Sequence, residues 1–308
     1  MFRGNTADWL LKTVWTLIFD WHNRAFAHKA LKVIDGKYDV VFCTAFSDFP
    51  LGAAKIIAKK LHLPLICDIR DLDEQVDDSR YQYHHQQWWL MPFRKLYRAI
   101  HIRRRNNVLR SADTITTVST WHAEFIKQFN SNTHIVYNGF DERQFFAQNI
   151  KTNQFTISYI GSLFEWQQSA LKTVKQALEQ LQLPVVLDIH TPKNNPIAHD
   201  QLGQAINRSS IMLVFTSPNT HGMLTTKFYE ALGCEKPILC VPSDKGELAA
   251  LIQHTNAGIA TDNIDSIKTF ITDKYNEWQK QGFTHQKVQH KEQFSRDFES
   301  KQIEQLLK

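Results

Sequence analysis

The amino-acid sequence predicts two doubly wound α/β domains, because short apolar runs alternate with helical stretches in two successive series. At 308 residues the chain is also too long for one ordinary hydrophobic core. Strands that are apolar along their whole length are typical of parallel sheets covered by helices on both faces. We therefore expect one domain in residues 1–140 and a second in residues 141–308.

The first series lies before Asn138-Gly139 and is rich in β-branched and apolar runs. It predicts strands at 40–43, 65–67, 114–118 and 135–137, and helices at 52–61, about 92–110 and 121–129.

The second series repeats this alternation after Asn138-Gly139. It predicts strands at 156–160, 185–189, 211–215, 237–241 and 258–260, and helices at 171–181, about 225–233 and 246–254. The tail should close the domain with further helices. The last of these carries one apolar stripe, formed by Phe294, Phe298, Ile303, Leu306 and Leu307.

Composition places the chain in the cytosol. No apolar run is long enough to span a bilayer, and charged residues interrupt the apolar N-terminal stretch, so a secretory signal is not expected. The four cysteines, Cys43, Cys67, Cys234 and Cys240, stand in apolar contexts without CxxC spacing. We interpret them as small buried side chains in a reducing compartment.

Positive charge is concentrated in one region. The formal net charge is +5, and no acidic residue occurs between Asp78 and Asp113. The basic residues there are Arg80, Arg94, Lys95, Arg98, Arg103, Arg104, Arg105 and Arg110. The apolar residues Trp88, Trp89, Leu90, Met91 and Phe93 lie among them. A solvated helix face and a surface for anionic lipid on the inner membrane face explain this pattern equally well. No recognition motif supports nucleic acid.

Two segments at the carboxyl ends of predicted strands could bind a phosphorylated ligand. Residues 159–162 lead from a strand into a turn at Gly161, where backbone can approach a phosphate closely. Residues 225–233 begin a helix with two threonines and Lys227, whose charge and N–H groups would attract a diphosphate. Glu230 could accept hydrogen bonds from a ribose. By spacing alone, an ordinary capped helix with a solvated Lys227 and Glu230 explains the pattern better.

The sequence of this helix resembles the donor-binding signature of glycosyltransferase family four. Residues 225–239, TTKFYEALGCEKPIL, are similar to T-G-K-[LI]-F-E-Y-L-A-x-G-K-P-I-L. Five further segments resemble the family in the same order: YDVV at 38–41, LICDIRDL at 65–72, SADTITTVS at 111–119, VYNGFD at 136–141 and SYIGSL at 158–163. Six weak matches in one order are unlike a chance agreement.

This resemblance implies the two-Rossmann-domain (GT-B) fold and a retaining transfer of a sugar. The donor would be a UDP- or GDP-linked sugar, and the acceptor a polysaccharide or a lipid-linked glycan. The family needs no metal at the diphosphate and no cofactor besides the donor. The chain would then act in the cytosol or peripherally on the inner membrane face.

The resemblance also assigns site residues. It implies that Glu230 holds the ribose and that Lys227 neutralises the leaving phosphates together with nearby backbone. The segments that approach the diphosphate are Gly161, Ser162, Met223, Leu224, Thr225 and Thr226. The base is expected near His190 and Thr191, and Arg70 and Asp71 of the first domain should face the sugar and the acceptor as catalytic residues.

The sequence departs from the family pattern at two places in the donor site, which together comprise three positions that are often charged in relatives. Gly222 stands where many relatives have a second glutamate, and Ser162 and Gln167 stand where relatives often have an arginine and a lysine. Charge neutralisation would therefore depend more strongly on Lys227 and the helix terminus.

A third departure concerns the first domain, which we expect to be incomplete. Only 37 residues, helical in character, precede the match at Tyr38, and no Gly-rich loop occurs there. The strand at 40–43 should then have an unprotected edge, covered at most in part by residues 5–34. A second polypeptide would have to supply the missing strands.

Two other functions stay open. The chain could be a truncated, non-catalytic nucleotide-binding subunit that needs a partner chain. It could also be a nucleotide-sugar epimerase, although the sequence offers no further acid/base carboxylates that we can assign.

Overall fold

The computed structural model describes residues 15, 18–75, 91–216 and 221–307, with residues 91–94 described by their backbone only. The predicted aromatic cluster at 88–93 and most of the stretch at 5–17 lie outside the described side chains. The chain divides into two compact units, Met1–Val136 and Tyr137–Leu306.

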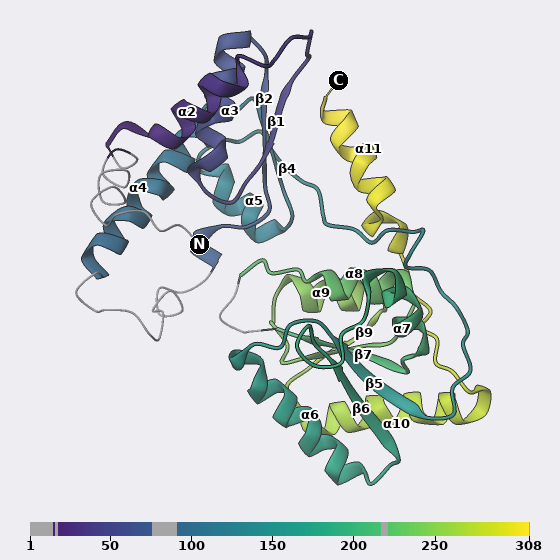
Figure 1. The fold of residues 1–308 in the computed structure, drawn as a ribbon. Helices are drawn as coiled ribbons and strands as arrows, with labels where there is room; N and C mark the ends of the chain where they lie inside the picture. Colours follow the sequence, from purple (N-terminus) through teal and green to yellow (C-terminus); the bar gives the residue numbers. More distant parts are fainter. Residues whose placement is uncertain (1–14, 16–17, 76–90, 217–220, 308) are drawn as a thin grey trace. The chain divides into compact units, whose positions relative to one another are not determined.

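The N-terminal unit contains a four-stranded parallel sheet in the order β1-β2-β3-β4. The strands are β1 (Val41–Thr44), β2 (Leu65–Ile69), β3 (Thr114–Thr117) and β4 (Thr133–Ile135). The helices are α2 (Trp21–Ala30), α3 (Asp48–Leu61), α4 (Met91–Leu109) and α5 (Thr120–Lys127) (Figure 1). Every residue of β2 is buried, and residues of α3, α4 and α5 join the central strands in one core.

Strand β1 has an unpaired edge within the described part of the unit. The Val41 N–H donates to the Pro64 carbonyl at 2.9 Å and the Ala45 N–H to the Asp68 carbonyl at 3.0 Å. In a parallel ladder, the backbone groups of Phe42 and Thr44 therefore point away from β2. The exposed edge expected from the sequence is present there. Helix α2 packs on α3 instead, where Asn23 accepts a hydrogen bond from the Ala53 N–H.

The basic region does not form one solvent-facing surface. Arg105 is completely buried, and its guanidinium makes two hydrogen bonds to Glu74, at 2.9 and 2.7 Å. Arg104 lies within 4.0 Å of Asp48 and 3.7 Å of Asp20. Both interpretations of the basic run, a solvated helix face and a surface for anionic lipid, are thus wrong for Arg105, whose charge is neutralised inside the unit.

The C-terminal unit contains a five-stranded parallel sheet in the order β6-β5-β7-β8-β9. The strands are β5 (Phe155–Ile160), β6 (Val185–His190), β7 (Ile211–Phe215), β8 (Ile238–Val241) and β9 (Gly258–Ala260). The helices are α6 (Gln168–Leu181), α7 (Leu202–Arg208), α8 (Thr226–Gly233), α9 (Glu247–His254), α10 (Ile264–Gln281) and α11 (Arg296–Leu306).

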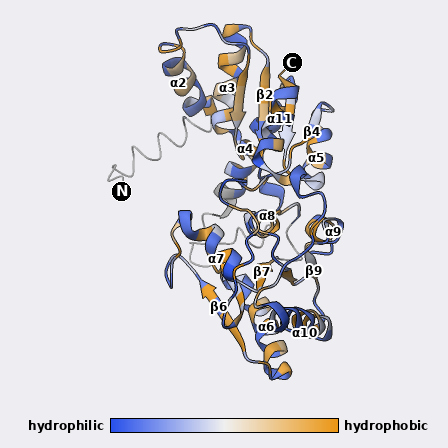
Figure 2. Ribbon diagram, turned by 90° about the vertical axis from the view of Figure 1, so that its right-hand side faces the viewer, coloured by the Kyte–Doolittle hydropathy of each residue, from blue (hydrophilic) through white to orange (hydrophobic). Residues whose placement is uncertain are grey.

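The helices cover this sheet on both faces. Residues of α6 and α10 pack with one set of strand side chains, and residues of α7, α8 and α9 pack with the other set. Strands β2 and β7 are mostly hydrophobic, whereas the helices mix hydrophilic and hydrophobic residues (Figure 2). The predicted doubly wound α/β class is confirmed for both units.

Gly233 at the end of α8 has a packing role. The sequence suggested a helix stop, but the residues at this end, up to the C-cap Cys234, stay right-handed. A Cβ built on Gly233 would lie 2.6 Å from the Phe140 ring, so only glycine permits this close contact. The glycine thus lets the segment after residue 136 lie against α8.

The four cysteines are buried and free, as predicted. Burial raises the pKa of Cys43 to about 11 and that of Cys67 to about 12. Within the described residues, no helix is both long and apolar enough to cross a membrane.

A buried histidine makes the N-terminal unit sensitive to acid. His122 is fully buried, its Nδ1 contacts the Ser119 hydroxyl, and its Nε2 has no hydrogen-bond partner among the described residues. Burial lowers the pKa of His122 from 6.5 to about 4. The unfolded chain therefore takes up this proton at a higher pH than the folded chain does, and stability is lost as the pH falls from 6.5 towards 4.

We expect His122→Gln to remove about 3 kcal/mol of this acid destabilisation, because glutamine stays neutral. Hydrogen exchange of the α5 amides at pH 7 and pH 4 measures the change. The exposed His134, replaced in the same way, provides the control. An equal loss of protection in wild type and His122→Gln would show that His122 does not cause the effect.

Candidate functional site

The candidate site lies where the order of the C-terminal sheet reverses. Strand β5 has β6 on one side and β7 on the other, so the chain leaves β5 in one direction and returns on its other side. Ligands of doubly wound sheets bind outside the carboxyl ends of the strands at such a point. Gly161 follows β5 directly, His190 ends β6, and α8 follows β7 along the chain.

The structure brings Gly161 and Lys227 together at this point. A Cβ built on Gly161 would lie 2.5 Å from Cε and 2.7 Å from Nζ of Lys227. Gly161 also has a φ of +139°, which side-chain-bearing residues rarely adopt. The glycine therefore leaves the space that the lysine amine occupies beside the backbone.

Tyr159 and Gln167 fix the loop that follows Gly161. The Tyr159 hydroxyl donates to the Ser162 carbonyl at 2.7 Å, and the side-chain oxygen of the buried Gln167 accepts from the Phe164 N–H at 2.8 Å. The Lys227 amine lies 5.4 Å from the centre of the Tyr159 ring, a cation–π distance. One tyrosine thus supports both the loop and the lysine. Ser162 itself is exposed.

Helix α8 begins beside this loop. Thr225 is its N-cap and accepts a long hydrogen bond, 3.4 Å, from the Lys227 N–H. Thr226 and Met223 are exposed, whereas Leu224 is buried in the core. The side chain of Leu224 therefore packs the unit, and only its backbone could contribute to a ligand site.

Glu230 lies one turn after Lys227 among positive groups. Burial raises the pKa of Glu230, and the charges of Lys227, His199 and Arg296 oppose this shift. Burial also lowers the pKa of Lys227, while Glu230 opposes that shift. Neither side chain makes a direct ion pair among the described residues. Both groups are thus partly desolvated and placed to exchange hydrogen bonds with a ligand.

His190 is held in place at the end of β6. Its carbonyl accepts from the Gly161 N–H at 2.9 Å, and its Nε2 lies 2.7 Å from the Asp188 carboxylate. Its Nδ1 lies 2.9 Å from the Asn195 carbonyl. Thr191 begins a tight turn in which its N–H donates to the Asn194 carbonyl. The two residues expected near the base therefore adjoin Gly161 in a fixed conformation.

Arg70 and Asp71 belong to the N-terminal unit and follow β2. The Arg70 Nε donates to Asp68 at 2.7 Å, and the buried Asp68 also accepts from Thr116 and Thr44, at 2.8 and 3.1 Å. Asp71 is exposed. The side chain of Arg70 is thus oriented by a buried carboxylate at the carboxyl end of its own sheet.

Several groups at the site were not expected from the sequence. Tyr159 and Gln167 support the loop, and His199 and Arg296 act electrostatically on Glu230. Only Gln167 stands at a position that the family comparison singles out. Among the described residues, no group of His, Cys, Asp or Glu side chains could hold a metal ion.

Comparison with known proteins finds a family model that matches the first part of the chain and solved structures that share the fold of the whole chain. The family model of Glycosyltransferase Family 4 matches residues 10–144. Anabaena HepE, solved with UDP and glucose, has a TM-score of 0.64 at 16% identity, over 92% of this chain and 80% of its own. Sucrose-phosphate synthase from Thermosynechococcus elongatus has a TM-score of 0.60 at 13% identity, over 92% and 76%.

The catalytic domain of starch synthase IV from Arabidopsis thaliana, solved with ADP and acarbose, has a TM-score of 0.55 at 10% identity, over 92% and 75%. At these identities the likeness shows the fold. A comparison with curated proteins finds no match in sequence. The family match over residues 10–144 indicates a relation to glycosyltransferases, and the solved structures share the fold. The resemblance to glycosyltransferase family four is thereby confirmed, and the chain has the two-domain α/β fold of such enzymes.

Proposed function

We propose that this chain transfers a sugar from a UDP- or GDP-linked donor to a polysaccharide or lipid-linked acceptor. The transfer would retain the anomeric configuration and need no metal at the diphosphate. One observation carries the proposal: the Lys227 amine lies against Gly161 at the sheet's reversal point, beside the start of α8. An ammonium group, helix N–H groups and an open glycine backbone suit the charge that develops on a leaving diphosphate.

The position of Glu230 supports a nucleoside diphosphate over a simple phosphate. Its carboxylate lies one turn along α8 from Lys227 and has no hydrogen-bond partner among the described residues. A vicinal diol can donate two hydrogen bonds to one carboxylate. We therefore assign the ribose to Glu230, the diphosphate to Lys227 and Gly161, and the base to the side of His190 and Thr191. Arg70 and Asp71 would serve the sugar and the acceptor.

A thermal-shift panel of UDP-, GDP- and ADP-sugars tests the proposal, with chain-elongation assays on the stabilising donors. Stabilisation by at least one nucleotide sugar, and by its nucleoside diphosphate, is expected. Product analysis by NMR then reports whether the anomeric configuration is retained. A chain that no nucleotide sugar stabilises would not be a donor-dependent transferase.

Replacing Glu230 should weaken nucleotide binding. We expect Glu230→Ala to cost about 1.5–3 kcal/mol, the range for hydrogen bonds to a charged group. Calorimetric titration with the best nucleoside diphosphate measures the loss. Glu179→Ala, an exposed position on α6, is the matched control and should bind as wild type does. Unchanged affinity in Glu230→Ala would remove this residue from the site.

Replacing Lys227 should affect the diphosphate alone. Lys227→Met keeps the long stem of the side chain but removes its charge. We expect the affinity for the nucleoside diphosphate to fall about tenfold or more and the affinity for the parent nucleoside to stay unchanged. Parallel calorimetric titrations of both ligands test this. An equal loss for both ligands would mean that the substitution disturbs the fold rather than a phosphate contact.

Donor binding should survive chelation of divalent ions. The amine of Lys227 and the start of α8 can stabilise the diphosphate without a metal. Titrating the protein with the nucleoside diphosphate in EDTA, and again in manganese, measures the dependence. Loss of binding in EDTA that manganese restores would contradict a metal-independent site.

A further inference from the structure

Along one row of neighbouring side chains, the C-terminal sheet changes from polar to apolar. Strand residues that are paired in register point to the same face of a parallel sheet. One such row runs from Asp188 on β6 through Ser158 on β5 to Met212 on β7 and Ile238 on β8. Met212 and Ile238 are buried in an apolar core under α8, whereas Asp188 and Ser158 are polar. Parallel strands normally carry apolar side chains on both faces.

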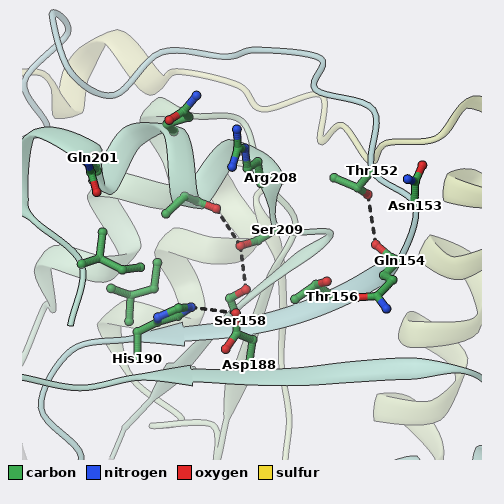
Figure 3. A pocket seen from close by; sticks show the side chains of 14 residues that line it. Thr152, Asn153, Gln154, Thr156, Ser158, Asp188, His190, Gln201, Arg208 and Ser209 are labelled. Atoms are coloured by element: carbon green, nitrogen blue, oxygen red, sulfur yellow. Dashed lines mark hydrogen bonds and ion pairs between the residues drawn. The ribbon is translucent and has the colours of Figure 1, made fainter. Parts of the chain in front are cut away.

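The polar part of this face is the floor of a groove of about 750 Å³. The floor carries Thr156, Ser158, Asp188 and His190, with α7 along one side and residues 152–154 at one end (Figure 3). The opposite face of β5 is apolar and packs under α6 and α10. The volume lies within the range of small-molecule sites.

Hydrogen bonds fix the floor of the groove. The Asp188 carboxylate lies 2.7 Å from His190 Nε2. Ser158 and Ser209, both buried, share a hydroxyl–hydroxyl bond of 2.7 Å, and Ser209 also bonds the Ala205 carbonyl at 3.0 Å (Figure 3). The polar groups of the floor are therefore arranged before any ligand arrives, which lowers the entropy cost of binding.

The side of the groove formed by α7 and the residue before it carries hydrogen-bond donors and acceptors that no other described residue uses. Gln201, Gln204 and Arg208 recur at helical spacing, so that they share one side of the helical segment and line the groove. Their side chains are exposed and have no hydrogen-bond partner among the described residues. Two amides, each a donor and an acceptor, thus stand beside one guanidinium.

The balance of charge decides the class of ligand. Arg208 adds one positive charge and Asp188 one negative charge. The two charges balance, so the groove has no net positive charge that would select an anion. An apolar ligand would strip water from all these polar groups without replacing their hydrogen bonds. A ligand with many hydroxyl groups replaces them, because each hydroxyl both donates and accepts.

We infer that this groove binds a saccharide beside the donor site, in the part that runs from His190, the residue next to the expected base, towards residues 152–154. One end adjoins the loop that begins at Gly161, here called the donor loop, since the His190 carbonyl accepts from the Gly161 N–H. The other end reaches residues 152–154, just before β5. A glycan in the groove would be held beside the donor loop while the nucleotide site stays available. That the saccharide is an acceptor or a product rests on the proposed transferase function. That a saccharide binds in the groove does not depend on that function.

Saturation-transfer NMR with maltose, cellobiose and N,N′-diacetylchitobiose tests the inference on the full chain. We expect at least one disaccharide to bind and its affinity to fall about tenfold in Gln201→Ala/Gln204→Ala, which removes two amides. The matched control is Gln176→Ala/Gln180→Ala on α6, across the sheet, and should bind as wild type does. All four positions are exposed, so that folding should be unaffected.

The competing explanations give different results. Saccharide binding that persists in saturating UDP or GDP supports a separate groove, and complete displacement by the nucleotide would overturn it. Equal binding by the double variant and wild type, or no binding of any of the three disaccharides, would also overturn it. Nucleotide affinity, titrated separately, tests the proposed function, because that function can fail while the groove still binds sugar.

Discussion

The close approach of the Lys227 amine to Gly161 is the constraint on which the candidate site depends. It requires a glycine with a φ of +139° after β5 and a helix that begins beside it. The parallel order β6-β5-β7 provides both, because it puts the carboxyl ends of these strands at one edge. Burial lowers the pKa of this amine, which is therefore a partly desolvated cation. A bound anion would offset that cost, and ligand affinity is thereby linked to stability.

The order of strands and helices could be predicted from sequence because parallel strands are apolar on both faces. Every strand of the described structure was expected, with ends that differ by one or two residues. Helix α7 was not expected, since its polar residues 204, 207 and 208 give a weak apolar pattern. Phe294 was expected on the last helix, but it lies in the turn before α11 and is buried against Tyr137 and Phe228. Long-range aromatic contacts of this kind leave no mark on local spacing.

In the candidate site, too, features that depend on neighbouring residues could be predicted, whereas contacts between distant parts of the chain could not. Gly161 and Thr225 lie in two short segments whose turn and capping patterns predict their backbone roles, whereas the roles of Lys227 and Glu230 are implied by the family resemblance. The groups that set their electrostatics come from elsewhere, as His199 and Arg296 do for Glu230. Arg105 illustrates the converse error. Its place in a basic run suggested solvent, but Glu74, 31 positions earlier, neutralises it inside the unit. A run of basic residues in the sequence does not show which acidic residue the fold places beside each of them.

Polarity within a buried sheet is itself a signal that sequence patterns contain. Strand β6 reads VVLDIH, so Asp188 and His190 fall on one face while Leu187 and Ile189 fall on the other. Such alternation is typical of a half-solvated strand, and a parallel sheet with helices on both faces rarely permits one. Strand β6 lies at the edge of the sheet, beside β5 alone, and α7 leaves part of its polar face open. Asp188 and His190 would destabilise a strand in the core, because burial would remove their water. On an edge strand beside a groove, the same side chains can contact a ligand. Strand β6 can therefore carry a polar face because it lies at the edge of the sheet. The hydrogen bond between Asp188 and His190 holds the side chains of this face in one arrangement.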